Sequence, residues 1–175
     1  MWTEKDFINA YEEYLLDSRQ NYLYKRTEYL MTKYYFGQST LLYGGAMGWG
    51  GLPLLKEGKF VYNYDTSDYI CNLANFWNEP LKPFKTLPEN YTFETIFFED
   101  SLTYYSAAEK VQYIIECLKY KPTLILILES SDEIEVSKEV NKNIIKGLKK
   151  IFPSAHIELE YYNTGEFTRN LNKHE

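Results

Sequence analysis

Cysteine and histidine are scarce in this chain of 175 residues, which has two of each. Cys71 and Cys117 have no CxxC spacing and no neighbouring histidine, so neither supports a zinc site and both are expected to be buried free thiols. His156 begins a predicted strand, and His174 is the penultimate residue. Because neither histidine accompanies a nucleophile motif, Ser-His-Asp and Cys-His catalysis are not expected.

Long apolar runs are also absent, since none approaches the roughly 20 residues of a membrane-spanning helix. The charged residues Glu4, Lys5 and Asp6 stand where a signal peptide needs an apolar core, so we expect a cytoplasmic protein. The formal net charge of −6 predicts repulsion from nucleic acids and anionic membranes, unless a local patch overrides it. We therefore expect no direct nucleic-acid contact and no membrane contact.

Tyrosine is the most over-represented residue, with 18 copies beside 10 phenylalanines. A tyrosine excess is typical of protein-binding surfaces, because the ring offers a large stiff contact area with a polar tip. Abundant Tyr, Asn, Ile and Lys with little Arg is also the composition that an AT-rich genome produces. Composition alone therefore leaves interface use and codon bias as competing explanations.

Glycine is concentrated in one segment, because seven of the nine glycines lie between Gly37 and Gly58. This density predicts either a mobile loop or a backbone that must approach something closely. A phosphate-binding loop is disfavoured, since no Gly-Lys-Ser/Thr follows and Pro53 stands where a helix start would be needed. The segment is therefore expected to be a partner-binding loop or lid, or else a plain connector.

The C-terminal half predicts a β-α-β-α-β unit. Tyr91–Phe98 is aromatic and β-branched, Thr123–Leu128 is a continuous apolar run, and His156–Tyr162 alternates, so each is expected to form a strand. The capping box Ser106-Ala107-Ala108-Glu109 starts the first helix. Right-handed crossovers then give an α/β fold with a mostly parallel sheet and the last strand at an edge. An α+β arrangement with one antiparallel edge strand fits almost as well.

We expect a single domain over residues 1–175, because this length suits one compact core. In chain order its parts are predicted to be a helix or helical hairpin over 1–37, a Gly-rich loop over 38–58, an irregular connector with a short strand and a short helix over 59–90, an α/β core over 91–163, and a C-terminal tail over 164–175. The oligomeric state is left open.

The second helix of the predicted core carries two stripes at a spacing of four residues. One stripe is apolar, and the other consists of Lys138, Lys142, Lys146 and Lys150. A solvated outer face explains the lysines, and binding of a phosphate or an acidic partner is the alternative.

Acidic residues follow two of the predicted strands. Glu99 and Asp100 come after the first strand of the unit, and Glu129 and Asp132 after the second. Because the carboxyl ends of parallel strands meet at one edge, these side chains are expected to gather there and to be able to bind Mg²⁺. The competing interpretation is structural, since acids favour the positive N-terminus of a helix and Asp132 suits an N-cap.

Two functions follow as hypotheses. The leading one is a non-enzymatic, acidic protein-binding module without a cofactor. It would inhibit a basic nucleic-acid-processing enzyme, in the manner of a phage anti-defence (anti-CRISPR-type) inhibitor or a toxin immunity protein. The expected contacts are aromatic at Tyr43, Met47 and Trp49 and electrostatic at Glu129, Asp132 and Glu133. The alternative is a Mg²⁺-dependent hydrolase or nuclease that uses Glu99, Asp100, Glu129 and Asp132 to activate water.

Overall fold

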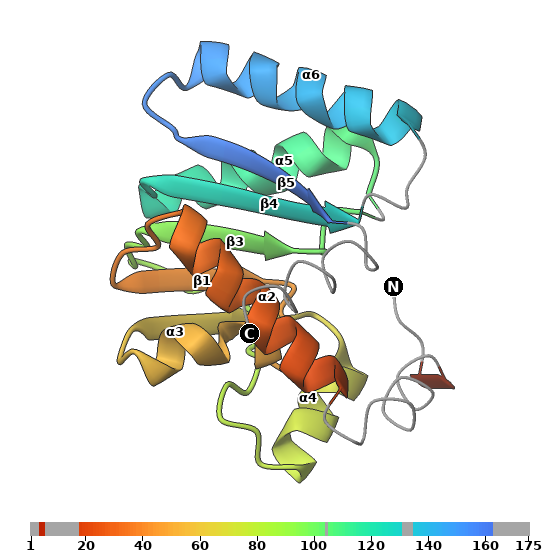
Figure 1. Ribbon diagram of the computed structural model, residues 1–175. Helices are drawn as coiled ribbons and strands as arrows, with labels where there is room; N and C mark the ends of the chain where they lie inside the picture. Colours follow the sequence, from red (N-terminus) through yellow and green to blue (C-terminus); the bar gives the residue numbers. More distant parts are fainter. Residues whose placement is uncertain (1–3, 6–17, 104, 131–134, 163–175) are drawn as a thin grey trace.

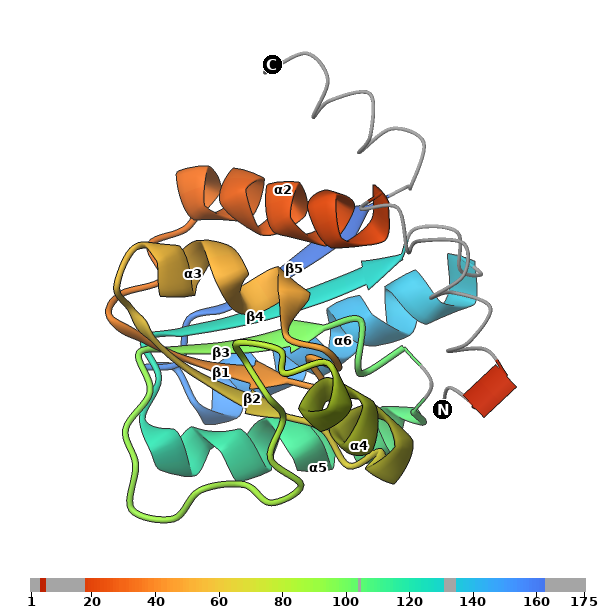
Figure 2. The ribbon, with the colours of Figure 1, turned by 90° about the horizontal axis from the view of Figure 1, so that it is seen from below.

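The computed structural model describes residues 4–5, 18–103, 105–130 and 135–162. Its centre is a five-stranded sheet in the order β2-β1-β3-β4-β5, in which every neighbouring pair is parallel. Helices α2 and α3 cover one face, and α5 and α6 cover the other (Figure 1, Figure 2). The predicted α/β class with a mostly parallel sheet and an N-terminal helix is confirmed, and no strand among the described residues pairs in the antiparallel direction.

The strands and helices alternate along the chain. Their bounds are α2 Ser18–Lys33, β1 Ser39–Tyr43, η1 Trp49–Gly51, α3 Leu52–Lys56, β2 Phe60–Tyr64, α4 Asp68–Phe76, β3 Thr95–Glu99, α5 Ala107–Cys117, η2 Leu118–Tyr120, β4 Leu124–Ser130, α6 Glu135–Ile151 and β5 Ile157–Tyr162.

The C-terminal half contains the predicted order β3-α5-β4-α6-β5, with β5 at the sheet edge. The capping box at the start of α5 is formed as expected: the Ser106 hydroxyl accepts the Glu109 N–H, and the Glu109 carboxylate accepts the Ser106 N–H. Strand β3 begins at Thr95, later than the predicted start at Tyr91, and the Phe93 N–H donates to the Tyr120 carbonyl at 3.2 Å outside the ladder.

The segment 38–58 differs from the predicted loop. It contains the central strand β1, the short helix η1 and the helix α3. Pro53, which the sequence interpretation placed outside a helix, lies in the first turn of α3, where a missing N–H costs no hydrogen bond. Strand β1 is hard to recognise because it is only five residues long, and a strand buried on both faces shows no alternation.

The sheet pleat divides the core into two layers. On β4, Leu124, Leu126 and Leu128 pack toward α2 and α3, whereas Ile125 and Ile127 pack toward α5 and α6. Each of these five side chains is at most 4% exposed, so β4 is buried on both faces. The continuous apolar run in the sequence is the consequence of that double burial.

The edge strand β2 is partly covered by the proline-containing connector. Phe84 forms a parallel bridge with Tyr64: its N–H donates to the Asn63 carbonyl at 2.8 Å, and its carbonyl accepts the Asp65 N–H at 3.0 Å. The Tyr62 hydroxyl donates to the Thr86 carbonyl at 2.8 Å. The connector therefore satisfies backbone groups that an open edge would leave to another chain.

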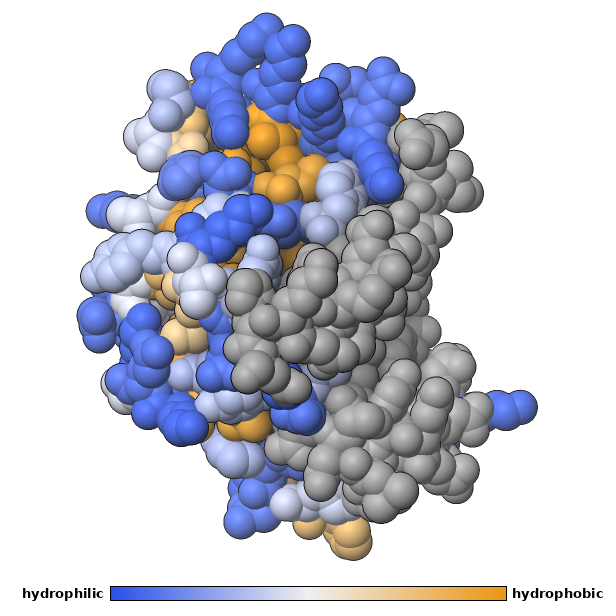
Figure 3. Space-filling model, in the orientation of Figure 1, coloured by the Kyte–Doolittle hydropathy of each residue, from blue (hydrophilic) through white to orange (hydrophobic). Residues whose placement is uncertain are grey.

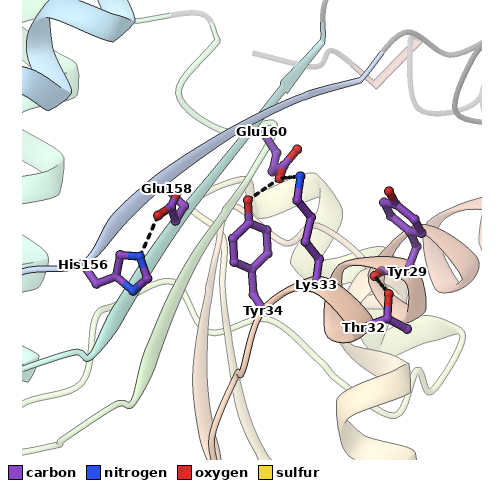
Figure 4. Close-up of polar contacts among 7 residues, drawn as sticks. All are labelled: Tyr29, Thr32, Lys33, Tyr34, His156, Glu158 and Glu160. Carbon is purple, nitrogen blue, oxygen red and sulfur yellow. Dashed lines mark hydrogen bonds and ion pairs between the residues drawn. The ribbon is translucent and has the colours of Figure 1, made fainter.

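The opposite edge strand, β5, is fixed to the end of α2 by polar contacts. Figure 4 shows Lys33 and Tyr34 converging on the Glu160 carboxylate, while His156 lies 2.6 Å from Glu158 on the same strand. Burial, followed by the contact with Glu160, raises the pKa of the Tyr34 hydroxyl. These contacts hold the N-terminal helix on the sheet. Among the described helices, none has the length and apolar character that crossing a membrane requires.

Candidate functional site

The strand order creates a switch point between β1 and β3. After β1 the chain crosses through α3 to β2 on one side, and after β3 it crosses through α5 to β4 on the other. The two crossovers run on opposite faces of the sheet, because α3 lies on one face and α5 on the other (Figure 2). In open parallel sheets, ligands bind beyond the carboxyl ends of the strands at such a point.

The glycine-rich turn that follows β1 is ordered by the end of β2. The N–H groups of Gly44 and Gly45 both donate to the Tyr64 carbonyl, at 2.8 and 3.3 Å. The buried Asn63 amide donates to the carbonyls of Ala46 and Leu81, at 2.9 Å each. This turn is therefore a defined structure that follows a central strand.

Asp65 connects the glycine-rich turn to the next helix. Its carboxylate accepts the Ala46 N–H at 3.1 Å and the Ser67 N–H at 3.0 Å, and Ser67 is the N-cap of α4. Burial raises the pKa of Asp65, although the two N–H donors act in the opposite direction. The residue is partly exposed and directly follows β2, at the carboxyl edge of the sheet.

Two glycines allow this turn to lie against the end of β3. A Cβ atom on Gly50 would stand 2.3 Å from both Glu99 carboxylate oxygens, and one on Gly44 would stand 2.4 Å from the Ser101 Cβ. Gly44 also has a φ of 72°, which side chains rarely adopt. The structure therefore shows close backbone approach, which the glycine density had suggested as one possibility.

Arg26 neutralises the acidic end of β3. It projects from α2, is 0% exposed, and donates from Nη2 to Glu99 at 3.1 Å and to Asp100 at 3.0 Å. Glu99 is buried, whereas the Asp100 side chain is 29% exposed. The backbone of Asp100 has a φ of 58°. One buried guanidinium therefore joins the N-terminal helix to the switch point.

Glu129 lies at the same edge of the sheet as Glu99 but on the opposite face. Glu99 is in register with Leu128, so the next residue of β4, Glu129, points the other way. The Glu129 carboxylate is 1% exposed, and it accepts from Lys110 of α5 at 3.2 Å and from the Asn141 amide of α6. The sheet thus separates two carboxylates that the sequence placed together, and each has its own cation.

The predicted four-carboxylate Mg²⁺ site requires Glu99 and Glu129 to lie together, but they are on opposite faces of the sheet. Asp100 lies beside Glu99, and Asp132 is outside the described residues. Over the ranges that the structure describes, no three His, Cys, Asp or Glu side chains are grouped as metal ligands would be.

The predicted partner-binding residues have mixed positions. Tyr43 is 6% exposed and packs on Tyr64 and Phe98, and Met47 is 3% exposed beside Ile70. Trp49 is half-buried, and Glu129 is buried in its ion pair. Asp132 and Glu133 lie outside the described residues. The two most buried side chains offer little surface to a partner.

Sequence reasoning missed four residues that shape the two polar sites: Asp65, Arg26, Lys110 and Asn141. Asp65 had a usable signal, because it directly follows a predicted strand and stands 20 positions after Gly45. The other three lie on helices at 73, 19 and 12 positions from the carboxylates that they contact, and helix periodicity does not reveal such pairs.

Comparison of the chain with known protein families, with curated proteins and with solved structures found no match.

Proposed function

We propose that this protein binds a small ligand with a ribose group, such as a nucleoside, at the carboxyl edge of β1 and β3. The observation that carries the proposal is the combination of a glycine-rich turn and an acidic strand end at the switch point. The chain runs from strand to glycine-rich turn, helix, strand and then Asp65. In dinucleotide-binding folds an acid about 20 residues after the glycines binds the ribose hydroxyls.

The glycine pattern does not support a pyrophosphate. Gly45, Gly48 and Gly50 are spaced G-x-x-G-x-G, whereas the dinucleotide fingerprint is G-x-G-x-x-G. The helix that follows, α3, has only five residues. A phosphate would therefore lack both the usual turn and a long helix behind it.

The charge of the site favours a neutral or cationic nucleoside. Asp65, Glu99 and Asp100 stand there with Arg26, and Arg26 is already paired with two of these acids. These four described residues carry three formal negative charges and one formal positive charge. Adenosine and the sulfonium nucleoside S-adenosylmethionine match this field, while AMP and ATP would be repelled.

A thermal-shift titration tests this selection. Saturating adenosine or S-adenosylmethionine should raise Tm by several degrees, because a ligand at 100 times its Kd stabilises the fold by about 2.7 kcal/mol. AMP and ATP should give a smaller shift at the same concentration. Equal shifts for all four compounds would refute the charge argument, and no shift with any of them would refute the proposed function.

Separate calorimetric titrations of the protein with adenosine and with 2′,3′-dideoxyadenosine test the role of Asp65. The dideoxy compound lacks the ribose hydroxyls, so it loses the hydrogen bonds to the charged carboxylate and should bind roughly 10- to 100-fold more weakly than adenosine. The variant Asp65→Asn should lose this discrimination. The matched control is Asp68→Asn, which alters an exposed acid at the start of α4 and should keep it.

Protein binding is a second candidate function, favoured by an exposed aromatic cluster around β2. Phe60, Phe84 and Tyr91 are 48%, 56% and 47% exposed, and Phe60 and Tyr91 stack with an interplanar angle of 15°. Aromatic rings that share an exposed area are typical of interaction surfaces. The contact would lie here and not at Tyr43 and Met47, and the net charge of −6 favours a partner with a basic surface.

Capture of a partner from the source cells tests this second candidate. The double variant Phe60→Ser, Tyr91→Ser should reduce capture at least tenfold, because central aromatic contacts are often worth 2 kcal/mol or more, roughly a 30-fold change. The control is Tyr35→Ser, which removes a ring that is 77% exposed outside the cluster. Equal capture by wild type and both variants would exclude this surface.

A further inference from the structure

The outer face of α6 carries a concentration of positive charge. Lys138, Lys142, Lys146, Lys149 and Lys150 fall within a sector of about 120° when successive residues are placed 100° apart. The opposite side of the helix packs on the sheet through Asn141, Ile144, Ile145 and Leu148. Figure 3 shows hydrophilic side chains over α6 at the top of the molecule.

Within the part of the chain that the structure describes, no ion pair neutralises these lysines. Lys142, Lys146, Lys149 and Lys150 are exposed, and none of them forms an ion pair with a described residue. Between Lys138 and Ile151 the five lysines are opposed by Glu139 alone, which leaves a net charge of +4. Because the whole chain carries −6, all other residues together carry −10.

We propose that this lysine face binds the phosphate backbone of a nucleic acid. The net charge predicts repulsion, but five of the chain's lysines are gathered on one side of α6, so this local patch can attract a polyanion that the average charge would repel. The proposal is independent of the ligand at the switch point.

The arrangement favours a nucleic acid over an acidic protein. Lysines four residues apart rise about 6 Å per step, so Lys138 to Lys150 form a regular row about 18 Å long. A nucleic acid presents a regular line of phosphates to such a row, whereas carboxylates on a folded protein are irregularly spaced. The face has no arginine for bidentate base contacts, so it is suited to holding the backbone without reading sequence.

Fluorescence anisotropy with labelled single-stranded RNA and duplex DNA tests the proposal at low and rising salt. The test variant replaces Lys142, Lys146, Lys149 and Lys150 by glutamine. The matched control makes the same replacement at Lys56, Lys82, Lys85 and Lys121, which are exposed on other elements and give the same change in net charge. Circular dichroism melting verifies that both variants fold. If the α6 variant does not fold, a milder variant with only Lys146→Gln and Lys150→Gln takes its place.

The α6 variant should bind at least tenfold more weakly at low salt, while the control should lose much less. The steepness of log K against log salt should fall by up to about 3.6 for duplex DNA and about 2.8 for a single strand. The reason is that a variant with four fewer phosphate contacts releases fewer counterions when it binds. Equal losses in both variants, or no binding by wild type at low salt, would overturn the proposal. Competition by polyglutamate as strong as that by an unlabelled oligonucleotide would assign the face to an acidic protein instead.

Discussion

Replacing Arg26 with methionine should lower the free energy of unfolding by about 3–5 kcal/mol, the usual cost of removing one partner of a buried ion pair. The guanidinium is fully buried and pairs with Glu99, itself 8% exposed, and with Asp100. In a chain of this size that loss corresponds to a fall in Tm of roughly 10 °C. Chemical denaturation of wild type and Arg26→Met measures it directly.

The pH dependence of the Arg26→Met variant separates lost charge pairing from lost packing. Removing the guanidinium takes a stabilising positive charge away from ionised Glu99, and protonation of Glu99 at low pH removes the same pairing from the wild type. The loss of stability relative to wild type should therefore be largest at neutral pH and should shrink as pH falls through the carboxylate range. Adding Glu99→Gln should restore part of the stability at neutral pH. A loss that is the same at all pH values, and that Glu99→Gln does not reduce, would indicate packing alone.

Lys110→Met should produce a second loss of about 3–5 kcal/mol, for the same reason on the other face of the sheet. Lys110 is 5% exposed and donates to Glu129 at 3.2 Å and to the Asn141 amide oxygen at 2.8 Å. Equilibrium denaturation of Lys110→Met, Glu129→Gln and their combination gives the coupling energy. The combination should be less destabilised than the sum of the single variants.

The separation of the two ion pairs can be tested by combining Arg26→Met with Lys110→Met. Because the sheet lies between the pairs, and because the hydrogen bonds that each pair forms among the described residues go to different partners, their effects should add to within about 0.5 kcal/mol. A larger coupling would mean that Glu99 and Glu129 interact electrostatically through the sheet, contrary to their placement on opposite faces.

Much of the C-terminal half was predictable because its patterns are local. A capping box, a helical apolar stripe and a doubly buried strand each occupy a short window, and the order of β3, α5, β4, α6 and β5 follows from them. Strand β1 was missed because Ser39–Tyr43 is short and continues into glycines. Without β1 the switch point could not be predicted, and the signal at Asp65 could not be assigned to it.

The candidate site was predicted only in part, because its geometry depends on register and on distant residues. The sequence placed Glu99 and Glu129 at one edge of the sheet, and they lie there, but a register of Glu99 with Leu128 puts them on opposite faces. Arg26 is 73 positions from Glu99, and no local pattern connects them. The tertiary structure alone shows which cation neutralises which acid.

The most direct test of the switch-point site is a titration of adenosine into ¹⁵N-labelled protein, followed by NMR of the backbone amides. Binding as proposed should shift the amides of residues 44–51, 65–67 and 99–101, while those of α6 and β5 stay in place. Shifts confined to the amino ends of the strands or to α6, or no shift at saturating adenosine, would contradict the account.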